Sequence, residues 1–278
     1  MQLKLSTSLT GARLLPAILV ATSLVLTAET HATSNYTLTD GASTALIDAD
    51  SGAGMYSWVV GGQEHLKKQW FYYRIGDTDY AAPINAISTS TLLGSAANIL
   101  ALNYANAQVS LTVTYVLTSS GQDSADIQET ISVQNVSDSP LNFHFFQYSD
   151  FNLSGTSGDD TVVFLGSDSV KQTELSFGIQ EGIISPSSSH LEAGFAGTGG
   201  TLDKLLSIPG YNLNDNGGPL TGDVTWSFQW DHVLQAGESL EILKDKTLIS
   251  PVIPEPTTAA LILLGVAALA VSQRRQSD

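Results

Sequence analysis

The one arginine between residues 33 and 250 is the first side chain that could bind a ligand or an ion partner. Alternation along an expected strand places Arg74 on one face with Trp70 and Tyr72. Glu129 falls on the apolar face of a second expected strand, where a carboxylate needs a partner. We therefore predict a bidentate bridge between Arg74 and Glu129. A core ion pair is favoured over a substrate-binding pair.

Four aromatic residues have the chemistry of a sugar-binding surface: Trp70, Tyr72, Trp226 and Trp230. Indole and phenol rings stack on the C–H faces of pyranose rings, and nearby polar side chains can bond the hydroxyl groups. The alternative is that these aromatics fill the core of a β-sandwich. The sequence favours the core and leaves ligand binding open.

Aspartates in two expected loops are the candidates for acid–base chemistry: Asp77 and Asp79 in one loop, and Asp150, Asp159 and Asp160 in the other. Paired carboxylates can cleave a glycosidic bond, one as the acid and one as the base or nucleophile. Such pairs are common in an acidic chain. A catalytic role is therefore an alternative rather than the main prediction.

Two short loops have oxygen ligands at the alternate spacing used by calcium sites. They contain Asp48 and Asp50, and Asn214 and Asp215. Neither continues into a full calcium-binding loop, and ordinary Asx turns explain both. No cofactor is predicted, with calcium as the one alternative.

These residues must be positioned by β-strands. Apolar and polar residues alternate over 111–118, 127–134 and 224–232, and turn-forming residues separate these runs. No helical periodicity of useful length is present in the body. The pattern predicts an all-β fold, an antiparallel β-sandwich over residues 33–250, with a barrel or jelly roll as the second choice.

Composition restricts the partners of this body. It contains seven basic and 24 acidic residues, which excludes nucleic acid and anionic lipid surfaces as partners. The chain has no cysteine, so neither disulfides nor thiolate metal sites are available. Stability must come from a large β core.

Both ends of the chain have the features of targeting segments. Residues 1–32 combine a basic start, an apolar stretch and small residues before an expected cleavage after Ala32, as in a signal peptide with its helix. Near the other end, Pro254, Glu255 and Pro256 precede an apolar helix over 258–273, and Arg274 and Arg275 follow it. This helix is just long enough to cross a membrane, with the arginines on the cytoplasmic side.

The segment 251–278 resembles the PEP-CTERM sorting signal of exopolysaccharide-producing Gram-negative bacteria, which has these three parts in this order. The resemblance implies recognition and processing near the Pro-Glu-Pro triplet by an exosortase. It also implies export, and transient anchoring in the inner membrane facing the periplasm. The cell surface or the extracellular space is then the destination.

Two aromatic tracts extend the comparison to the body. Residues 69–77 and 143–153 resemble a body type that recurs among PEP-CTERM proteins and has no assigned activity. The second tract is also similar to the Asn-His-Tyr-Phe-Asn-Leu stretch of aldose mutarotases, which are large β-sandwiches of the supersandwich type. His144 lies outside that register. The similarity therefore implies a supersandwich-like fold rather than epimerase activity.

The function predicted from these observations is non-catalytic. We expect an exported cell-envelope or extracellular-matrix protein that associates with exopolysaccharide and has the exosortase and the export machinery as partners. The first alternative is a carbohydrate-active enzyme, an epimerase or glycoside hydrolase that uses the loop carboxylates. The second is a calcium-dependent adhesion module.

Overall fold

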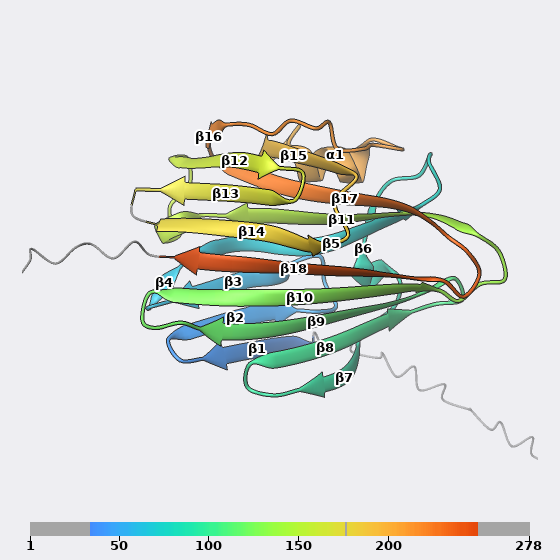
Figure 1. The fold of residues 1–278 in the computed structure, drawn as a ribbon, viewed down its shortest axis with the longest axis horizontal. Helices are drawn as coiled ribbons and strands as arrows, with labels where there is room; N and C mark the ends of the chain where they lie inside the picture. Colours follow the sequence, from blue (N-terminus) through green and yellow to red (C-terminus); the bar gives the residue numbers. More distant parts are fainter. Residues whose placement is uncertain (1–33, 176, 250–278) are drawn as a thin grey trace, which may run out of the picture. The chain divides into compact units, whose positions relative to one another are not determined.

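Residues 34–175 and 177–249 are described by a computed structural model, in which they form two nine-stranded sheets (Figure 1). Sheet A has the order β1-β2-β3-β5-β11-β17-β15, with β4 paired to β3 and β6 paired to β5. Its strands are Asn35–Asp40 (β1), Ser43–Asp48 (β2), Gly54–Val60 (β3), Gln63–Glu64 (β4), Leu66–Ile75 (β5), Ala82–Pro83 (β6), Leu141–Phe151 (β11), His190–Phe195 (β15) and Val224–Leu234 (β17).

Sheet B has the order β16-β12-β13-β14-β18-β10-β9-β8-β7. Its strands are Thr91–Ser95 (β7), Ile99–Ala105 (β8), Val109–Ser119 (β9), Ser124–Asn135 (β10), Asp160–Gly166 (β12), Ser169–Glu174 (β13), Phe177–Ser185 (β14), Leu220–Gly222 (β16) and Ser239–Ile249 (β18). The predicted antiparallel β-sandwich is confirmed. Within these strands, only the short pairing of β3 with β5 is parallel.

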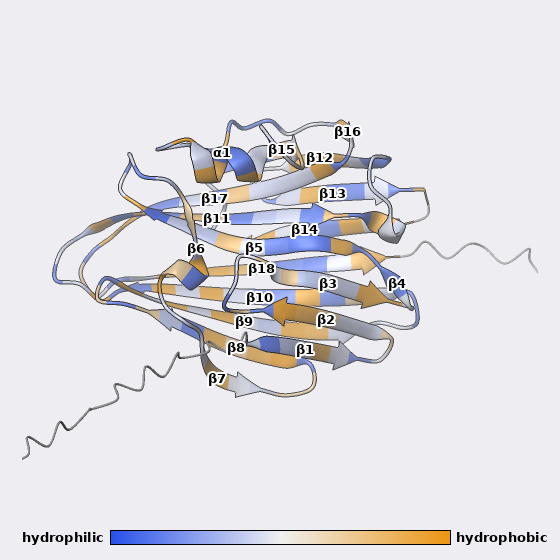
Figure 2. Ribbon diagram, turned by 180° about the vertical axis from the view of Figure 1, so that it is seen from behind, coloured by the Kyte–Doolittle hydropathy of each residue, from blue (hydrophilic) through white to orange (hydrophobic). Residues whose placement is uncertain are grey.

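The predicted alternation of apolar and polar residues determines which side chains of sheet B point into the core. Leu111, Val113, Tyr115 and Leu117 on β9 are fully buried, and the residues between them face outward. Figure 2 shows this alternation as apolar and polar bands along the strands. The turn at Ser119–Gly121 joins β9 to β10, and Ala236-Gly237 lies between β17 and β18, as expected.

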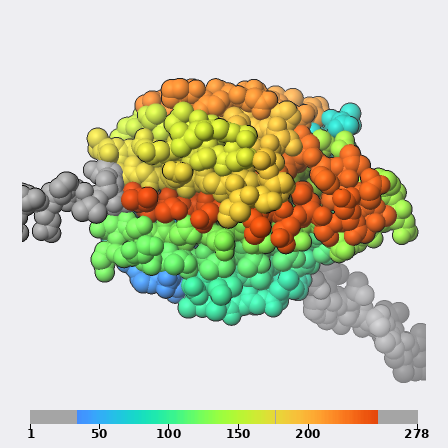
Figure 3. Space-filling view, in the orientation of Figure 1, coloured from blue at the N-terminus to red at the C-terminus, as the bar shows by residue number. Residues whose placement is uncertain are grey.

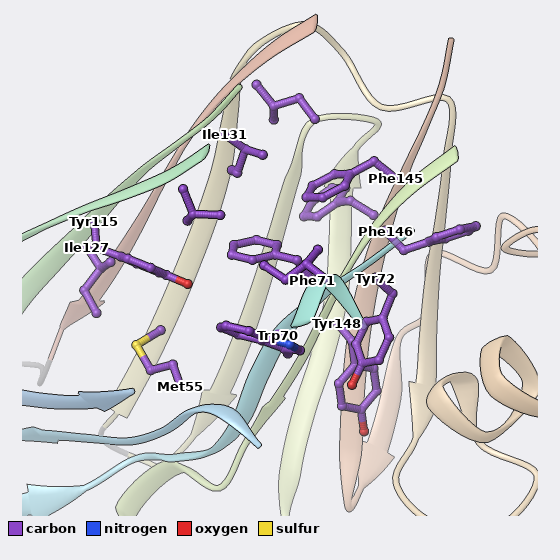
Figure 4. Packing of buried hydrophobic residues seen from close by; sticks show 14 of the residues in the cluster. Met55, Trp70, Phe71, Tyr72, Tyr115, Ile127, Ile131, Phe145, Phe146 and Tyr148 are labelled. Atoms are coloured by element: carbon purple, nitrogen blue, oxygen red, sulfur yellow. The ribbon is translucent and has the colours of Figure 1, made fainter. Parts of the chain in front are cut away.

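Aromatic side chains fill the space between the sheets. The Phe71 ring of β5 stacks on Phe145 of β11 at 5.6 Å and contacts Tyr115 of sheet B at 6.4 Å between ring centroids (Figure 4). Ile127 and Ile131 of β10 complete this part of the core. Burial of this apolar surface supplies the stability that the chain cannot take from disulfides.

The central strands of sheet A are buried on both faces, which the alternation did not predict. Segments 76–90 and 208–216 cover the outer face of the sheet. A backbone hydrogen bond from Gly210 N to Asp79 O joins these segments, and Ala81 N donates to Leu205 O of the neighbouring helix. The short helix α1 (Thr201–Ser207) contacts β15 and β17 (Figures 1 and 2).

Three short helical turns complete the elements: α1, η1 (Ile84–Ala86) and η2 (Leu153–Gly155). The sequence analysis found no helix in the body because seven residues are too few to establish a 3.6-residue period. In the part of the chain that the structure describes, no helix has both the length and the apolar content needed to cross a membrane. The signal helix and the helix predicted over 258–273 lie outside the described residues.

Candidate functional site

The predicted aromatic residues lie on β5 and β17, but not at an open surface. Trp70, Tyr72, Trp226 and Trp230 are each at most 2% exposed. Trp226 stacks on Phe151 at 5.1 Å between ring centroids. These rings therefore pack in the interior, and their faces are closed to a sugar in this structure.

The predicted bridge between Arg74 and Glu129 is wrong. Arg74 lies on the outer face of sheet A and donates hydrogen bonds to Gly76 O, to Tyr211 O at 2.6 Å and to Asn212 Oδ1 at 2.8 Å. The guanidinium also lies over the Phe146 ring. Arg74 thus holds the covering segment 208–216 against the sheet, while Glu129 belongs to the inner face of sheet B.

Glu129 instead belongs to a buried cluster of two acids and two lysines. Lys244 Nζ contacts Glu129 Oε2 and lies 3.1 Å from Glu181 Oε1. Lys246 Nζ lies 2.7 Å from the same Glu129 oxygen and 3.7 Å from Glu181 Oε1. All four side chains are completely buried. The two carboxylate charges are balanced by the two lysine charges. We call these four residues the core charge cluster.

Side chains of sheet A complete the surroundings of this cluster. Gln147 Nε2 and Trp226 Nε1 each donate to Glu181 Oε2 at 2.8 Å. Lys244 Nζ lies over the Phe71 ring at 5.1 Å. Trp226, which was predicted as a sugar-binding aromatic, therefore donates a hydrogen bond in the core. It holds the carboxylate of Glu181, which the sequence analysis did not select.

A chain of histidines and aspartates lies on the outer face of sheet A beside Arg74. His144 Nδ1 bonds Asp231 Oδ1 at 2.5 Å, and its Nε2 lies 3.2 Å from Asp77 Oδ1. His190 lies 3.5 Å from the other oxygen of Asp231 and 3.0 Å from Asp215 Oδ2. Burial raises the pKa of Asp231, but hydrogen bonds from His144 and Gln229 outweigh burial, so the pKa is lowered. These contacts tie the covering loops to the sheet.

The calcium candidates take part in turn hydrogen bonds. Asp48 accepts bonds from Asp50 N and Ser51 Oγ, and Asp50 accepts one from Ser90 N. Asn214 Oδ1 accepts from Asn216 N, and Asp215 contacts His190. Across residues 34–175 and 177–249, no group of three acidic or histidine side chains has the arrangement to hold a metal ion. Calcium binding at these loops gains no structural support.

Two of the carboxylates predicted for catalysis are buried, and they lie on β11 and β12 rather than in a loop. Asp160 is fully buried and Asp150 is 8% exposed. Burial raises the pKa of Asp160 to about 7 and that of Asp150 to about 6. Asp77 lies at the surface and bonds His144 and Asn142.

The raised pKa of Asp160 predicts a pH-dependent stability. Because the folded pKa lies above the unfolded value of about 3.9, the neutral form is favoured by folding, and stability falls as pH rises from about 4 to about 7. We expect Asp160→Asn to remove this decline and to raise stability at pH 8 by about 1–3 kcal/mol, measured by urea unfolding. Asp159→Asn, at the exposed neighbour, should leave most of the decline in place, because the Asp159 charge is the smallest of the causes that raise the pKa of Asp160. Equal pH profiles for wild type and Asp160→Asn would contradict this assignment.

An open site that the sequence analysis missed lies on the outer face of sheet B. Two adjoining hollows of about 320 Å³ and 380 Å³ share Gln180 and Ile249 on β14 and β18. Their walls also include Lys171, Thr173, Leu175 and Phe177 in the first hollow, and Ile184, Asp245 and Thr247 in the second. Figure 3 shows β14 and β18 side by side on this face, in yellow and red. We call this surface the β14–β18 groove.

Glycine creates the space in this groove. The outward positions of β14 read Gly178, Gln180 and Gly182, so side chains are missing on both sides of one glutamine. A Cβ at Gly182 would meet no atom within 4 Å. The walls combine apolar carbon with amide, hydroxyl and charged groups, a composition suited to a sugar chain. The only signal in the sequence was this Gly-x-Gln-x-Gly run. It indicates a groove only when the neighbouring strands β13 and β18 are known to form its walls.

A third hollow, of about 260 Å³, lies between β15 and α1. The buried Glu192 in its wall accepts bonds from Thr201, Lys204 and Tyr211 at 2.6 to 3.0 Å. This carboxylate is already fully engaged in fastening α1 and the covering segment. None of the three hollows described here is lined by two carboxylates.

Comparison with known proteins adds information about the end of the chain. Residues 252–276 match the PEP-CTERM protein-sorting motif. The chain carries a PEP-CTERM sorting motif. This motif implies export, a C-terminal membrane anchor before processing, and exosortase-mediated processing in Gram-negative bacteria. Pro254, Glu255, Pro256, Arg274 and Arg275 lie within it and, like the predicted cleavage site at Ala32, outside the described residues.

No curated protein matches this chain in sequence. Among solved structures, it is similar to a galactose mutarotase-like protein from Lactobacillus casei (TM-score 0.54, 11% identity, covering 77% of this chain and 100% of that one). A galactose mutarotase related enzyme from Lactobacillus acidophilus gives a TM-score of 0.52 at 11% identity and covers 78% and 98%.

A bacterial glucoamylase complexed with acarbose gives a TM-score of 0.55 at 8% identity. The match covers 81% of this chain but only 32% of the glucoamylase chain. These likenesses show a shared fold and agree with the predicted supersandwich-like architecture. They do not transfer an activity.

Proposed function

We propose that the protein is a non-catalytic component of the cell envelope or extracellular matrix that binds exopolysaccharide after export. The β14–β18 groove is the observation that carries this proposal. It is open, it runs across neighbouring strands, and it offers both apolar carbon and hydrogen-bonding groups. The sorting motif supports the delivery of the body to the compartment where such polymers are found.

The charge of the body favours a neutral polymer. Its 24 acidic residues exceed its seven basic ones, and two of those lysines are buried in the core charge cluster. Such a surface repels an acidic polysaccharide at low ionic strength. The groove itself has one lysine and one aspartate, Lys171 and Asp245, so it carries no net charge.

Binding can be tested by affinity electrophoresis of the purified protein in gels that contain dextran, soluble cellulose or alginate. We expect a neutral polymer to retard the wild-type protein. Gly182→Leu should abolish the retardation because the new side chain fills the groove without backbone strain. Gly94→Leu is the matched control, since Gly94 is also open to solvent but lies on β7.

Two results would overturn the proposal. Equal retardation of the Gly182→Leu and Gly94→Leu variants would remove the groove as the binding surface. No retardation of the wild type by any of the three polymers would count against exopolysaccharide binding itself. The alternatives, a carbohydrate-active enzyme and a calcium-dependent adhesion module, gain no support from the described residues beyond the mutarotase-like fold.

A further inference from the structure

The core charge cluster places a lysine directly opposite a glutamate on neighbouring strands. In the antiparallel ladder of β10 and β18, Glu129 is paired with Lys244. In the ladder of β14 and β18, Glu181 is paired with Lys246. All four side chains point to the inner face of sheet B, where water is excluded.

The two acids differ in their surroundings. Glu181 is held by Gln147 and Trp226 at one oxygen and by Lys244 at the other. Glu129 receives both lysines at Oε2, while its Oε1 is buried with no hydrogen-bond partner among the described residues. A buried charge with an unpartnered oxygen is costly. Glu129 therefore has one oxygen that no donor among the described residues holds, whereas both oxygens of Glu181 are held.

We propose that Lys244 and Glu129 join in an intramolecular isopeptide bond, with Glu181 as the acid–base group. The Nζ of Lys244 attacks Cδ of Glu129, the bond from Cδ to one carboxyl oxygen breaks, and one water molecule leaves. The product is a neutral amide between β10 and β18. The reaction needs no oxidant or other co-reactant.

The cluster contains a group that can carry out each step of this condensation. A proton passes from the Lys244 ammonium to the Glu129 carboxylate, which leaves a neutral amine and a neutral acid. Attack then forms a tetrahedral intermediate, and Lys246, at 2.7 Å from Glu129 Oε2, stabilises the negative oxygen. Glu181, at 3.1 Å from Lys244 Nζ, takes the second nitrogen proton and returns it to the departing hydroxyl group.

The surroundings of Lys244 favour the neutral amine that this attack needs. Burial, followed by the neighbouring Lys246 cation, lowers the pKa of Lys244 well below its ordinary value. The Phe71 ring lies beside the amine and Tyr115 packs on that ring, so bulk water is kept away. Exclusion of water also disfavours the reverse reaction, which is hydrolysis of the amide.

The product leaves fewer buried charges in the core. One carboxylate and one ammonium disappear, and Lys246 remains paired with Glu181 at 3.7 Å. The amide nitrogen stays within hydrogen-bond reach of Glu181, and the amide oxygen can accept from Lys246. The bond would tie β18, the last strand before the sorting motif, to the middle of sheet B in a chain that has no cysteine. Such a link holds the body to the segment through which it is anchored.

Peptide mapping of the purified full chain tests the proposal. After digestion with chymotrypsin, tandem mass spectrometry should find a branched peptide in which the Glu129 and Lys244 segments are joined, with the mass of their sum less one water. Recovery of both segments only as linear, unmodified peptides from the folded wild-type protein would overturn it and would leave a non-covalent ion cluster.

Two variants locate the chemistry. Glu181→Gln retains both bonded residues and should yield the linear peptides. Glu241→Gln makes the same change on the exposed side of β18 and should leave the branched peptide intact. A branched peptide at wild-type yield in Glu181→Gln would refute the role of Glu181. Should that variant fail to fold, the wild-type map still decides whether the bond exists.

Discussion

Replacing Trp226 with alanine is expected to lower the free energy of unfolding by about 3–5 kcal/mol, because it leaves a large cavity in the core. The substitution removes the ring that stacks on Phe151 and the indole N–H that donates to Glu181. The loss can be measured by urea unfolding followed by fluorescence of the remaining tryptophans. It is one of the two largest effects that we expect for a single substitution.

Trp226→Phe is the matched variant, since it keeps one aromatic ring, removes the donor and leaves a much smaller cavity than alanine. Its expected cost is about 1–3 kcal/mol, the cost of leaving a buried acceptor without one partner. A Trp226→Ala protein as stable as Trp226→Phe would show that the cavity has little influence. The burial of Trp226 would then be assigned incorrectly.

Lys246→Met is expected to destabilise the fold by about 3–5 kcal/mol, because it removes one cation from a cluster in which both acids are buried. The methionine fills much of the lysine volume, so the loss reports on charge rather than on packing. Urea unfolding again provides the measurement. The expectation holds whether or not Lys244 is bonded to Glu129, since Lys246 balances Glu181 in both cases.

Charge balance can be restored by a second substitution. In the double variant Lys246→Met with Glu181→Gln, one charge of each sign is gone, and the glutamine oxygen still accepts from Trp226. We expect the double variant to be more stable than Lys246→Met alone by about 1–3 kcal/mol. Additive losses in the double variant would contradict the account of these residues as one electrostatic unit.

Local pattern was enough to predict the fold class. The alternation on β9 and β10 and the turns after Ser119 and at Ala236-Gly237 depend only on neighbouring residues, so they could be recognised in the sequence. The acidic composition and the sorting motif at residues 252–276 are likewise properties of the linear chain. These features depend on the linear chain alone, and they predict an all-β protein with a sorting motif that implies export.

The tertiary structure decided which faces are open and which charges meet. Alternation identifies two faces of β5 and β17, but it contains no information about the segments 76–90 and 208–216 that cover one of them. This is why Trp70 and Tyr72 were open candidates in the sequence and are buried in the fold. The partner of Arg74 was equally hidden, because Tyr211 and Asn212 lie more than a hundred residues further along the chain.

The partner of Glu129 shows the same limit. The sequence correctly required a cation for a carboxylate on an apolar face, and Arg74 was predicted because it is the one arginine between residues 33 and 250. Lys244, 115 residues away, becomes its neighbour only when β18 pairs with β10. Strand order decides such contacts, because it brings together inner faces that the linear sequence keeps far apart.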